Sequence, residues 1–486
     1  MSLRTRLTAA SPAESLATVA SGLRRLLQLL LLVAVLLTVV SVGGSFLGAE
    51  TSVDELSTET GGTLVATIDG TGPGQLVAYG PDGNVRYRNR TYDIYHDVDP
   101  SPVGEQTVLY VASDRRPASA VREQFTTPNT GATTRSNTGA TATSTGTAVE
   151  SNGGATADSN ETVDCGDTCL VNVIERVNLT TGEVTRLHAS VDDTAGSSQT
   201  HDVDRVNDSV VLVGDISFPD RVYTLNTTTG EILWEWRVSS AFSTDSGGRY
   251  PGDWTHLNDV ELLPDGRVMV NLRNHDQVVF IEPGAGLQPS WTLGTDGNHS
   301  RLYEPHNPDY IPRSRGGPAV VIADSENNRL VEYQRENGSW ERSWHWADRR
   351  LQWPRDADRL PSGRTLVADS HGSRVLVVGR NGSRAWSAPF PDGVYDVELL
   401  GTGAESTGPS ATRAGLDSRR VRTEGLAPAY RVATAVPPLV LHGLLFLLPT
   451  WTTTTDAVLL LVTAGLAAVL LAVEAVTRLW RRLSES

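Results

Sequence analysis

Residues 257–283 read LNDVELLPDGRVMVNLRNHDQVVFIEP, and residues 354–382 read PRDADRLPSGRTLVADSHGSRVLVVGRNG. Each stretch runs through a short strand with acidic residues, a turn containing Pro-x-Gly-Arg, an apolar strand, a polar turn and another apolar strand. Residues 306–334, HNPDYIPRSRGGPAVVIADSENNRLVEYQ, follow the same plan with a longer turn. The chain therefore contains a repeated β-unit.

The first strand of this unit occurs six times, at starts near residues 96, 201, 256, 306, 355 and 395. Short strands and tight turns that repeat roughly every 40 to 55 residues are typical of propellers. We therefore predict an all-β fold, a six-bladed β-propeller over residues 60–400. A β-sandwich is the alternative, but it would not explain the repeat.

The sixth copy stops after one strand, at Leu400, so its other strands must come from elsewhere. Three strand-like runs precede the first copy: Leu64–Ile68, Gln75–Tyr79 and Asn84–Arg88. We expect them to complete the sixth blade and to close the ring with both ends of the segment, because closure removes exposed sheet edges. Residues 113–163 offer little to bury and are predicted to be a disordered insert, and residues 401–431 a linker.

The charge of the chain is strongly acidic. It has 57 Asp and Glu against 41 basic residues, all of them arginine, and a net charge of −16. This balance favours a high-salt environment, with GC-rich coding as the alternative. It argues against a nucleic-acid partner, which would require a basic surface.

Apolar segments occur at both ends. Residues 22–48 carry no charge between Leu26 and Val42, and Arg24 and Arg25 come just before. We interpret this segment as an uncleaved transmembrane anchor that leaves residues 1–21 in the cytoplasm, with a cleaved signal peptide as the alternative.

Residues 432–478 are predicted to form one or two further membrane helices, which bind lipid. Ala457–Val473 is apolar and leads into a basic tail at 479–486, which favours a cytoplasmic end. Val432–Leu448 is also apolar but contains two prolines, so the sequence leaves two or three spans open.

The middle segment has features of an extracytoplasmic domain of a membrane protein. Cys165 and Cys169 stand alone in DCGDTC, which predicts a local disulfide outside the cell, with free thiols as the alternative. Eight Asn-x-Ser/Thr sequons fit a glycoprotein. They lie at Asn89, Asn160, Asn178, Asn207, Asn226, Asn298, Asn337 and Asn381.

Candidate site residues stand at one position of the repeat. His96, His201, His256 and His306 open four of the first strands, and Arg355 and Tyr395 open the fifth and sixth. First strands line the channel of a propeller, so we expect these side chains to converge at one mouth of it. Asp97 and Asp202, by strict strand alternation, are expected on the opposite face.

Several motifs follow in a fixed order: DWTHLNDV (253–260), VNLRNHDQVVFIEP (270–283), WTLGTDG (291–297), His306 and VVIADSENNRLVEY (320–333). They resemble the PAPS-independent arylsulfotransferase family over roughly residues 200–350. The first two are similar to its Asp-Trp-x-His-x-Asn motif and its Ser-x-Arg-His-Gln strand. Asp324-Ser325-Glu326 stands where the family has Asp-Asn-Gly.

The resemblance implies a cofactor-free transferase that moves a sulfuryl group from an aryl sulfate to a phenolic acceptor through a sulfo-histidine. It makes His306 the nucleophile, and His201 and His256 acid/base groups and sulfuryl ligands. Arg273 then stabilises the charge on the equatorial oxygens. Four residues are expected to bind substrate: His96, Arg355, Tyr395 and Trp254.

Other functions stay open at this point. A catalytically silent propeller that binds a glycan, a peptide or an envelope partner is the main alternative. Four histidines also suit a metal, although we expect none, because no carboxylate or cysteine stands in register with them. No GxGxxG or Walker loop occurs, so a dinucleotide site is not expected.

Overall fold

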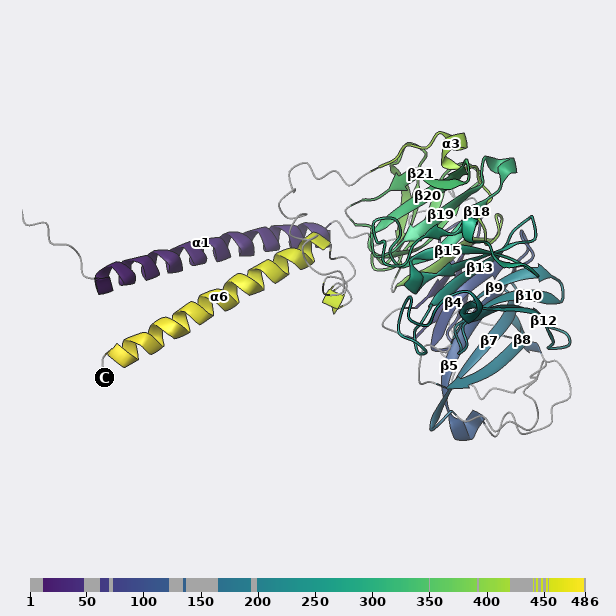
Figure 1. Ribbon diagram of the computed structural model, residues 1–486, viewed down its shortest axis with the longest axis horizontal. Helices are drawn as coiled ribbons and strands as arrows, with labels where there is room; N and C mark the ends of the chain where they lie inside the picture. The colour runs from purple at the N-terminus through teal and green to yellow at the C-terminus, as the bar shows by residue number, and fades with distance from the viewer. Residues whose placement is uncertain are drawn as a thin grey trace, which may run out of the picture. The chain divides into compact units, whose positions relative to one another are not determined.

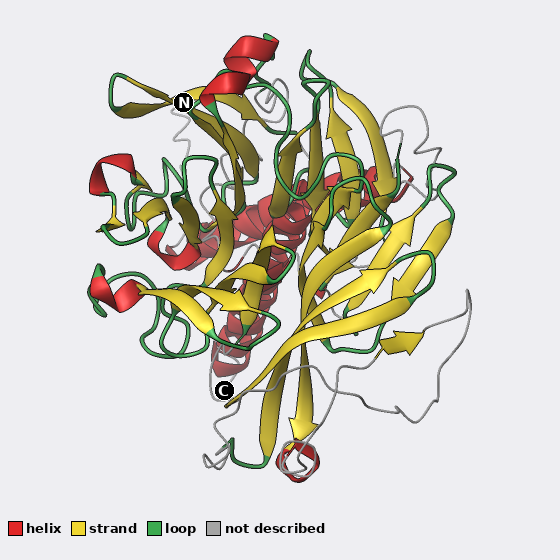
Figure 2. Cartoon of the chain, turned by 90° about the vertical axis from the view of Figure 1, so that its right-hand side faces the viewer, coloured by secondary structure: helices red, strands yellow, loops and turns green. Residues whose placement is uncertain are grey.

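The computed structural model divides the chain into two compact units, residues 50–421 and residues 1–49 with 422–486. It describes residues 12–47, 62–69, 73–121, 134–136, 165–193, 199–348, 350–390, 393–419 and 454–484, with 440, 443–444, 447–448 and 452. The larger unit consists almost entirely of antiparallel sheets, drawn as yellow strands in Figure 2.

The larger unit is a six-bladed β-propeller, as the repeat predicted. Each of its six sheets has one inner strand, and neighbouring inner strands contact each other around the ring. Figure 1 labels four of them in succession: β4, β9, β13 and β18. The inner strands are β4 (Ile94–Pro100), β9 (Thr200–Asn207), β13 (Leu257–Leu262), β18 (Pro305–Ile311), β22 (Pro354–Arg359) and β26 (Val394–Leu399).

The outer strands complete each blade. The first blade adds β5 (Thr107–Pro117), β7 (Thr168–Asn178), β8 (Glu183–Asp193) and β6 (Thr134–Ser136). The second adds β10 (Val210–Asp215), β11 (Arg221–Asn226) and β12 (Ile232–Arg237). The third adds β14 (Val268–Leu272), β15 (Gln277–Glu282), β16 (Gly286–Leu287) and β17 (Leu293–Gly294).

The fourth blade adds β19 (Ala319–Asp324), β20 (Arg329–Glu336) and β21 (Ser339–Trp346), and the fifth adds β23 (Thr365–Asp369), β24 (Arg374–Val378) and β25 (Arg384–Pro389). Short 3-10 helices connect strands: η2 (Val238–Ser240), η3 (Arg273–His275), η4 (Pro289–Trp291) and η5 (Arg313–Arg315). Apolar side chains of adjacent blades pack face to face; for example, Phe280 of β15 lies in one buried cluster with Val320 of β19. This burial between sheets is the main favourable contribution to the fold.

The ring closes through both ends of the propeller segment, which confirms the predicted closure. The sixth blade has the order β26-β1-β2-β3, with β1 (Leu64–Ile68), β2 (Gln75–Tyr79) and β3 (Val85–Asn89). Strand β1 pairs antiparallel with β26, and Ala66 lies opposite Val397. A blade built from the two ends of the segment ties the first and last copies of the repeat together.

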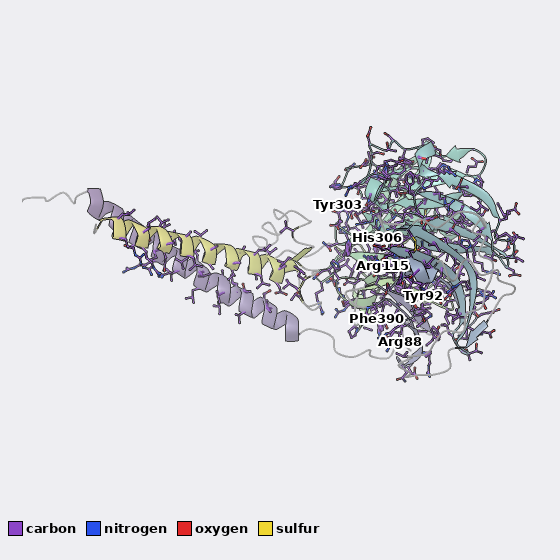
Figure 3. The ribbon with its side chains drawn as sticks, turned by 90° about the horizontal axis from the view of Figure 1, so that it is seen from below. Arg88, Tyr92, Arg115, Tyr303, His306 and Phe390 are labelled. Carbon is purple, nitrogen blue, oxygen red and sulfur yellow. A yellow bond between two sulfur atoms is a disulfide. The ribbon has the colours of Figure 1, made fainter. Side chains whose placement is uncertain are left out.

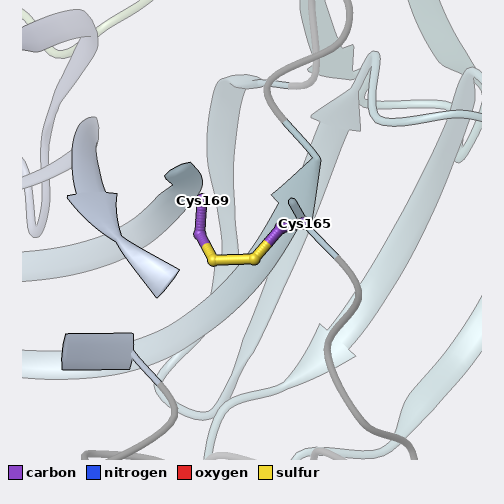
Figure 4. The surroundings of a disulfide bond; sticks show 2 residues. All are labelled: Cys165 and Cys169. Atoms are coloured by element: carbon purple, nitrogen blue, oxygen red, sulfur yellow. A yellow bond between two sulfur atoms is a disulfide. The ribbon is translucent and has the colours of Figure 1, made fainter. Parts of the chain in front are cut away.

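The predicted insert begins later than residue 113. Strand β5 runs to Pro117 and pairs with β7 along its length, and a helical turn follows to residue 121. Backbone pairing with β7 carries the polar end of β5, residues 114–117, into the sheet. Beyond residue 121 the predicted insert, apart from 134–136, lies outside the described residues. The predicted disulfide is present: Cys165 and Cys169 are bonded at the start of β7 (Figure 4).

Residues 401–419 are not a free linker. The segment packs along the fourth and fifth blades, where the backbone N–H of Arg359 donates to Ser406 Oγ at 2.6 Å and Gly408 N–H donates to the Arg359 carbonyl at 2.7 Å. Ser410 is the N-cap of the short helix α3 (Ala411–Ala414). The backbone N–H of Ala411 donates to the carboxylate of Glu332 at 2.9 Å. The small residues that suggested a linker allow this segment to approach the blades closely. Composition alone therefore did not predict that residues 401–419 are ordered.

The smaller unit contains two long helices, α1 (Pro12–Leu47) and α6 (Thr454–Ser484), that lie side by side and antiparallel (Figure 1). Ser21–Gly43 and Thr455–Leu479 are long and apolar enough to cross a membrane. Arg24 pairs with Glu474 at 2.8 Å near one end. Thr38 and Thr463 share a hydrogen bond of 2.9 Å nearer the other. Most of the predicted span at Val432–Leu448 lies outside the described residues.

Candidate functional site

A β-bulge near the start of each inner strand builds the site. The pairing registers shift at this place in all six blades; in the fifth, Pro354 pairs with Asp369 and Asp356 pairs with Ala368, which leaves Arg355 as the extra residue. Bulges re-aim side chains and are common beside active sites. In this propeller each bulge lets two nearly consecutive side chains of an inner strand face the channel, such as Arg355 and Asp356 in the fifth blade. The expectation that Asp97 and Asp202 lie on the opposite face is therefore wrong, because both line the central cavity.

The imidazoles of the repeat position lie against one another. The His96 and His201 rings stack with centroids 4.1 Å apart, and the His201 and His256 centroids are 5.0 Å apart. The Tyr395 ring lies 5.1 Å from His96 and 6.2 Å from His306. Figure 3 labels His306 among the side chains of the propeller. The structure thus brings together five side chains that are more than 290 residues apart at the extremes.

The hydrogen bonds of His306 define its tautomer. Its Nδ1 lies 3.1 Å from the carbonyl oxygen of Glu304 and 2.8 Å from Ser325 Oγ. The Ser325 hydroxyl also donates to the Pro354 carbonyl at 2.6 Å, so both partners can accept from Nδ1. Nδ1 therefore carries the proton, and Nε2 keeps its lone pair. A neutral imidazole with a free Nε2 is equipped to act as a nucleophile.

His256 and Arg273 each have a carboxylate partner. His256 Nδ1 lies 2.6 Å from Asp253 Oδ1, which orients the ring and leaves Nε2 for proton transfer. Arg273 donates to Glu304. These four side chains are only partly buried, so they form the rim through which a ligand would reach the deeper imidazoles.

Arg355 has no carboxylate partner among the described residues. Its guanidinium lies 4.5 Å from the centroid of the Trp353 ring on one side and 4.5 Å from that of Tyr395 on the other. Its Nε–H is buried and donates to no acceptor among the described groups. A guanidinium held between two rings with donors to spare is arranged to bind an anion.

Backbone strain concentrates around the same residues. His256, Glu304, Asn307 and Trp353 have φ values of 46°, 44°, 36° and 51°. This region is costly for non-glycine residues, on the order of 1–3 kcal/mol each. The surrounding sheets hold these residues in place, and such strain is typical of functional sites.

The imidazoles are uncharged near neutral pH. Burial lowers the pKa of His201 and of His306 well below the usual value. The neighbouring imidazoles and Arg273 lower the pKa of His201 further. Arg273, Arg355 and His256 lower that of His306 further. Burial lowers the pKa of His256 to about 4, with Arg273 adding to it and Asp253 opposing it. Burial also lowers the pKa of His96. Neutral imidazoles and two guanidinium groups make a site that suits an anionic ligand.

Trp254 is not part of this site. Its ring is 2% exposed and packs on His275, and its Nε1–H donates to the Ser246 carbonyl at 2.8 Å. The tryptophan of the predicted motif therefore belongs to the hydrophobic core of the second and third blades. A tryptophan that was not predicted, Trp353, lies beside the imidazoles instead, with its ring centroid 6.1 Å from that of His306.

Sequence reasoning missed the groups that orient the imidazoles. Gln199 Oε1 lies 2.9 Å from His96 Nε2, and Ser325, Glu304 and Asp253 orient the other rings as described. Asp253 stands inside DWTHLNDV, three residues before His256, so the motif contained this signal. Ser325 was noted only as a departure from Asp-Asn-Gly, whereas its hydroxyl is within hydrogen-bond distance of the proposed nucleophile.

No family model matches the chain, and no curated protein matches it. Among solved structures, it is similar to a protein of unknown function from Bacteroides caccae, at 9% identity over 69% of this chain and 97% of that one, TM-score 0.43. It is also similar to the periplasmic gluconolactonase of Pseudomonas aeruginosa, at 13% identity over 70% and 98%, TM-score 0.39. A third is virginiamycin B lyase from Staphylococcus aureus, at 8% identity over 71% and 88%, TM-score 0.36.

Proposed function

We propose that this propeller is a membrane-anchored transferase that moves a sulfuryl group from an aryl sulfate to a phenolic acceptor. The observation that carries the proposal is the tautomer of His306, which keeps a neutral Nε2 among three other imidazoles and two guanidinium groups. The order of motifs that resembles the arylsulfotransferases supports the same chemistry. The solved structures share only the fold and carry no argument for it.

In the first step His306 Nε2 attacks the sulfur of the ester. The N–S bond forms, the S–O bond to the aryl group breaks, and the phenolate leaves as an anion that takes its proton from solvent, because the neutral His256 keeps its proton on Nδ1 toward Asp253. Charge on the three equatorial oxygens is stabilised by Arg273 and Arg355, which is the main catalytic contribution expected for a loose transition state. In the second step an acceptor phenol attacks sulfur, His256 takes its proton, and His306 regains its lone pair.

The arrangement of the two helices supports anchoring with the propeller on the extracytoplasmic face. Because α1 and α6 are antiparallel, their arginine-rich ends lie together, with Arg24 beside Glu474 and Arg478 also paired to Glu474. Basic flanks stay in the cytoplasm, so both termini would lie inside and residues 50–421 outside. Protease added to intact cells is then expected to cut the propeller; cleavage only after lysis would contradict this orientation.

A silent binding propeller is the second candidate, and burial favours it. His201 and His306 are each only 2% exposed, so a closed site with a purely structural imidazole cluster is physically reasonable. The two candidates differ in turnover. Full-length protein in detergent at high salt, incubated with nitrophenyl sulfate and phenol, is expected to release nitrophenol and form phenyl sulfate. A folded protein that binds aryl sulfates without releasing nitrophenol would overturn the enzyme in favour of the binding propeller.

A further inference from the structure

The channel interior, directly beyond the imidazoles on the same strands, is a small acidic cavity. Its volume is about 20 Å³, enough for roughly one or two water-sized species. Ten of the fourteen residues that line it are carboxylates, and none of the fourteen is basic. They are Asp97, Asp99, Asp202, Asp204, Asp259, Asp309, Asp356, Asp396, Glu398 and Glu405.

Some of these carboxyl groups connect the blades. Asp396 accepts the backbone N–H of Val98 at 2.8 Å, and Asp356 accepts that of Val397 at 3.3 Å. Each of these contacts uses one oxygen of the carboxylate. Structural bonding between blades therefore explains only part of the acidic lining.

Three carboxyl groups converge on one point. One oxygen from each of Asp356, Asp358 and Glu398 lies within 4.8 Å of the others, and all three side chains are buried. Asp358 Oδ1 and Glu398 Oε2 are buried and accept no hydrogen bond from the described residues. Buried carboxylate oxygens without donors are costly, and either a proton or a bound cation can remove that cost. The guanidinium of Arg359, next in the chain, does not supply the positive charge, because it pairs with Glu332 at 3.1 Å.

We propose that Asp356, Asp358 and Glu398 bind one divalent cation of the calcium type inside the channel. Ca²⁺ takes oxygen ligands at about 2.3–2.6 Å, so two ligands of one ion are at most about 5 Å apart, which the observed spacing satisfies. Three carboxylates carry more charge than a monovalent ion can balance. Glu405, from the segment that packs across the blades, adds a further carboxylate to the same cavity.

The carboxyl groups are costly to ionise in this buried position. Burial raises the pKa of Asp358 and Glu398 well above the usual value, and neighbouring carboxylates raise it further. Without a cation these groups must share protons. A bound divalent ion would let them ionise and would join the fifth and sixth blades, the sixth being the one that closes the ring.

The test uses full-length protein in detergent, stripped with EDTA and returned to buffers of equal ionic strength with NaCl or CaCl2. Thermal unfolding is expected to shift upward by about 5 °C or more when Ca²⁺ is 100-fold above its Kd. Elemental analysis before stripping is expected to find about one divalent ion per chain, as the single proposed site requires. Equal unfolding temperatures in NaCl and CaCl2, with no metal in the purified protein, would overturn the proposal in favour of shared protons.

Variants locate the site. Asp358→Asn with Glu398→Gln is expected to fold, to unfold in EDTA at a temperature no lower than that of the wild type, and to lose the calcium shift. The control Asp245→Asn, an exposed carboxylate, keeps the full shift. A double variant that keeps the shift would contradict these ligands. Should the double variant not fold, Asp356→Asn alone must weaken calcium binding in calorimetry by at least about 10-fold, and unchanged affinity would overturn the proposal.

Discussion

The mouth and the interior of the channel are built from the same six strands but have opposite chemistry. At the mouth, a residue near the start of each inner strand presents an imidazole, a guanidinium or a phenol; inside, the following positions present carboxylates. Burial keeps the imidazoles neutral, whereas it raises the pKa of Asp204 and Asp396 to about 7. The bulge in each inner strand lies between the residue at the mouth and the carboxylates inside. Neighbouring positions of one strand therefore contribute to sites for ligands of opposite charge.

The residues at the mouth and the carboxylates inside are expected to have different roles, the first in turnover and the second in folding. Residues at the mouth bond mostly to side chains and to each other, and their loss is expected to affect turnover more than folding. Carboxylates inside bond to the backbone of the next blade, so their loss is expected to affect folding more than turnover. The following predictions test this division, from the largest effect to the smallest.

Replacing His306 by alanine is expected to reduce sulfuryl transfer by on the order of 10⁴-fold or more, the scale of losing a nucleophile. The rate of nitrophenol release from nitrophenyl sulfate measures this loss. The control is His188→Ala, a histidine on β8 away from the mouth, which should keep near-normal turnover. Equal loss in both variants, or full activity in His306→Ala, would contradict the role of His306.

Arg355→Gln is expected to lower kcat/KM by roughly 100-fold, as for loss of one transition-state donor, and to leave the unfolding temperature nearly unchanged. Arg273→Gln should lower kcat/KM similarly but also destabilise the fold, because it leaves Glu304 partly buried without its partner. Kinetics and thermal unfolding of both variants check this. Destabilisation by Arg355→Gln alone would mean that the ring-stacked guanidinium is structural.

Asp396→Ala is expected to cost about 1–3 kcal/mol of unfolding free energy, because the Val98 N–H loses its buried acceptor. Asp396→Asn keeps an acceptor oxygen and should cost less than half of that. Chemical denaturation measures both, with exposed Asp245→Ala as the neutral control. If alanine and asparagine cost the same, the contact between the first and sixth blades contributes little.

The pH profile tests the neutral state of the imidazoles. Because the nucleophile must be unprotonated and burial lowers its pKa, transfer is expected not to fall as the pH drops through about 6.5, the usual histidine value, and to fall only at lower pH. The stability that these imidazoles contribute falls below about pH 6.5, since the unfolded chain takes up their protons first. A rate that already halves near pH 6.5 would indicate a solvated histidine. The ionisable groups around His306 are Arg273, Arg355, His256, Glu304 and Tyr395.

The repeat was enough to predict the propeller, its closure by residues 64–88 and the position of the four imidazoles. Strict alternation could not predict the bulges, so Asp97 and Asp202 were placed on the wrong face. The order of residues 401–419 depends on buried serine hydroxyls such as Ser406, which in a sequence look like any linker. Trp254 was predicted to bind substrate because it lies in the motif with His256. A motif does not show which of its side chains pack in the hydrophobic core, as Trp254 does.

The central claim is a covalent intermediate on one histidine, and mass spectrometry tests it most directly. Protein incubated with nitrophenyl sulfate without acceptor is expected to gain about 80 Da, one sulfuryl group, in an acid-labile adduct on the peptide that contains His306. Phenol should remove the adduct, and His306→Ala should not form it. Folded protein that releases nitrophenol with no adduct, or with the adduct on another residue, would contradict the account.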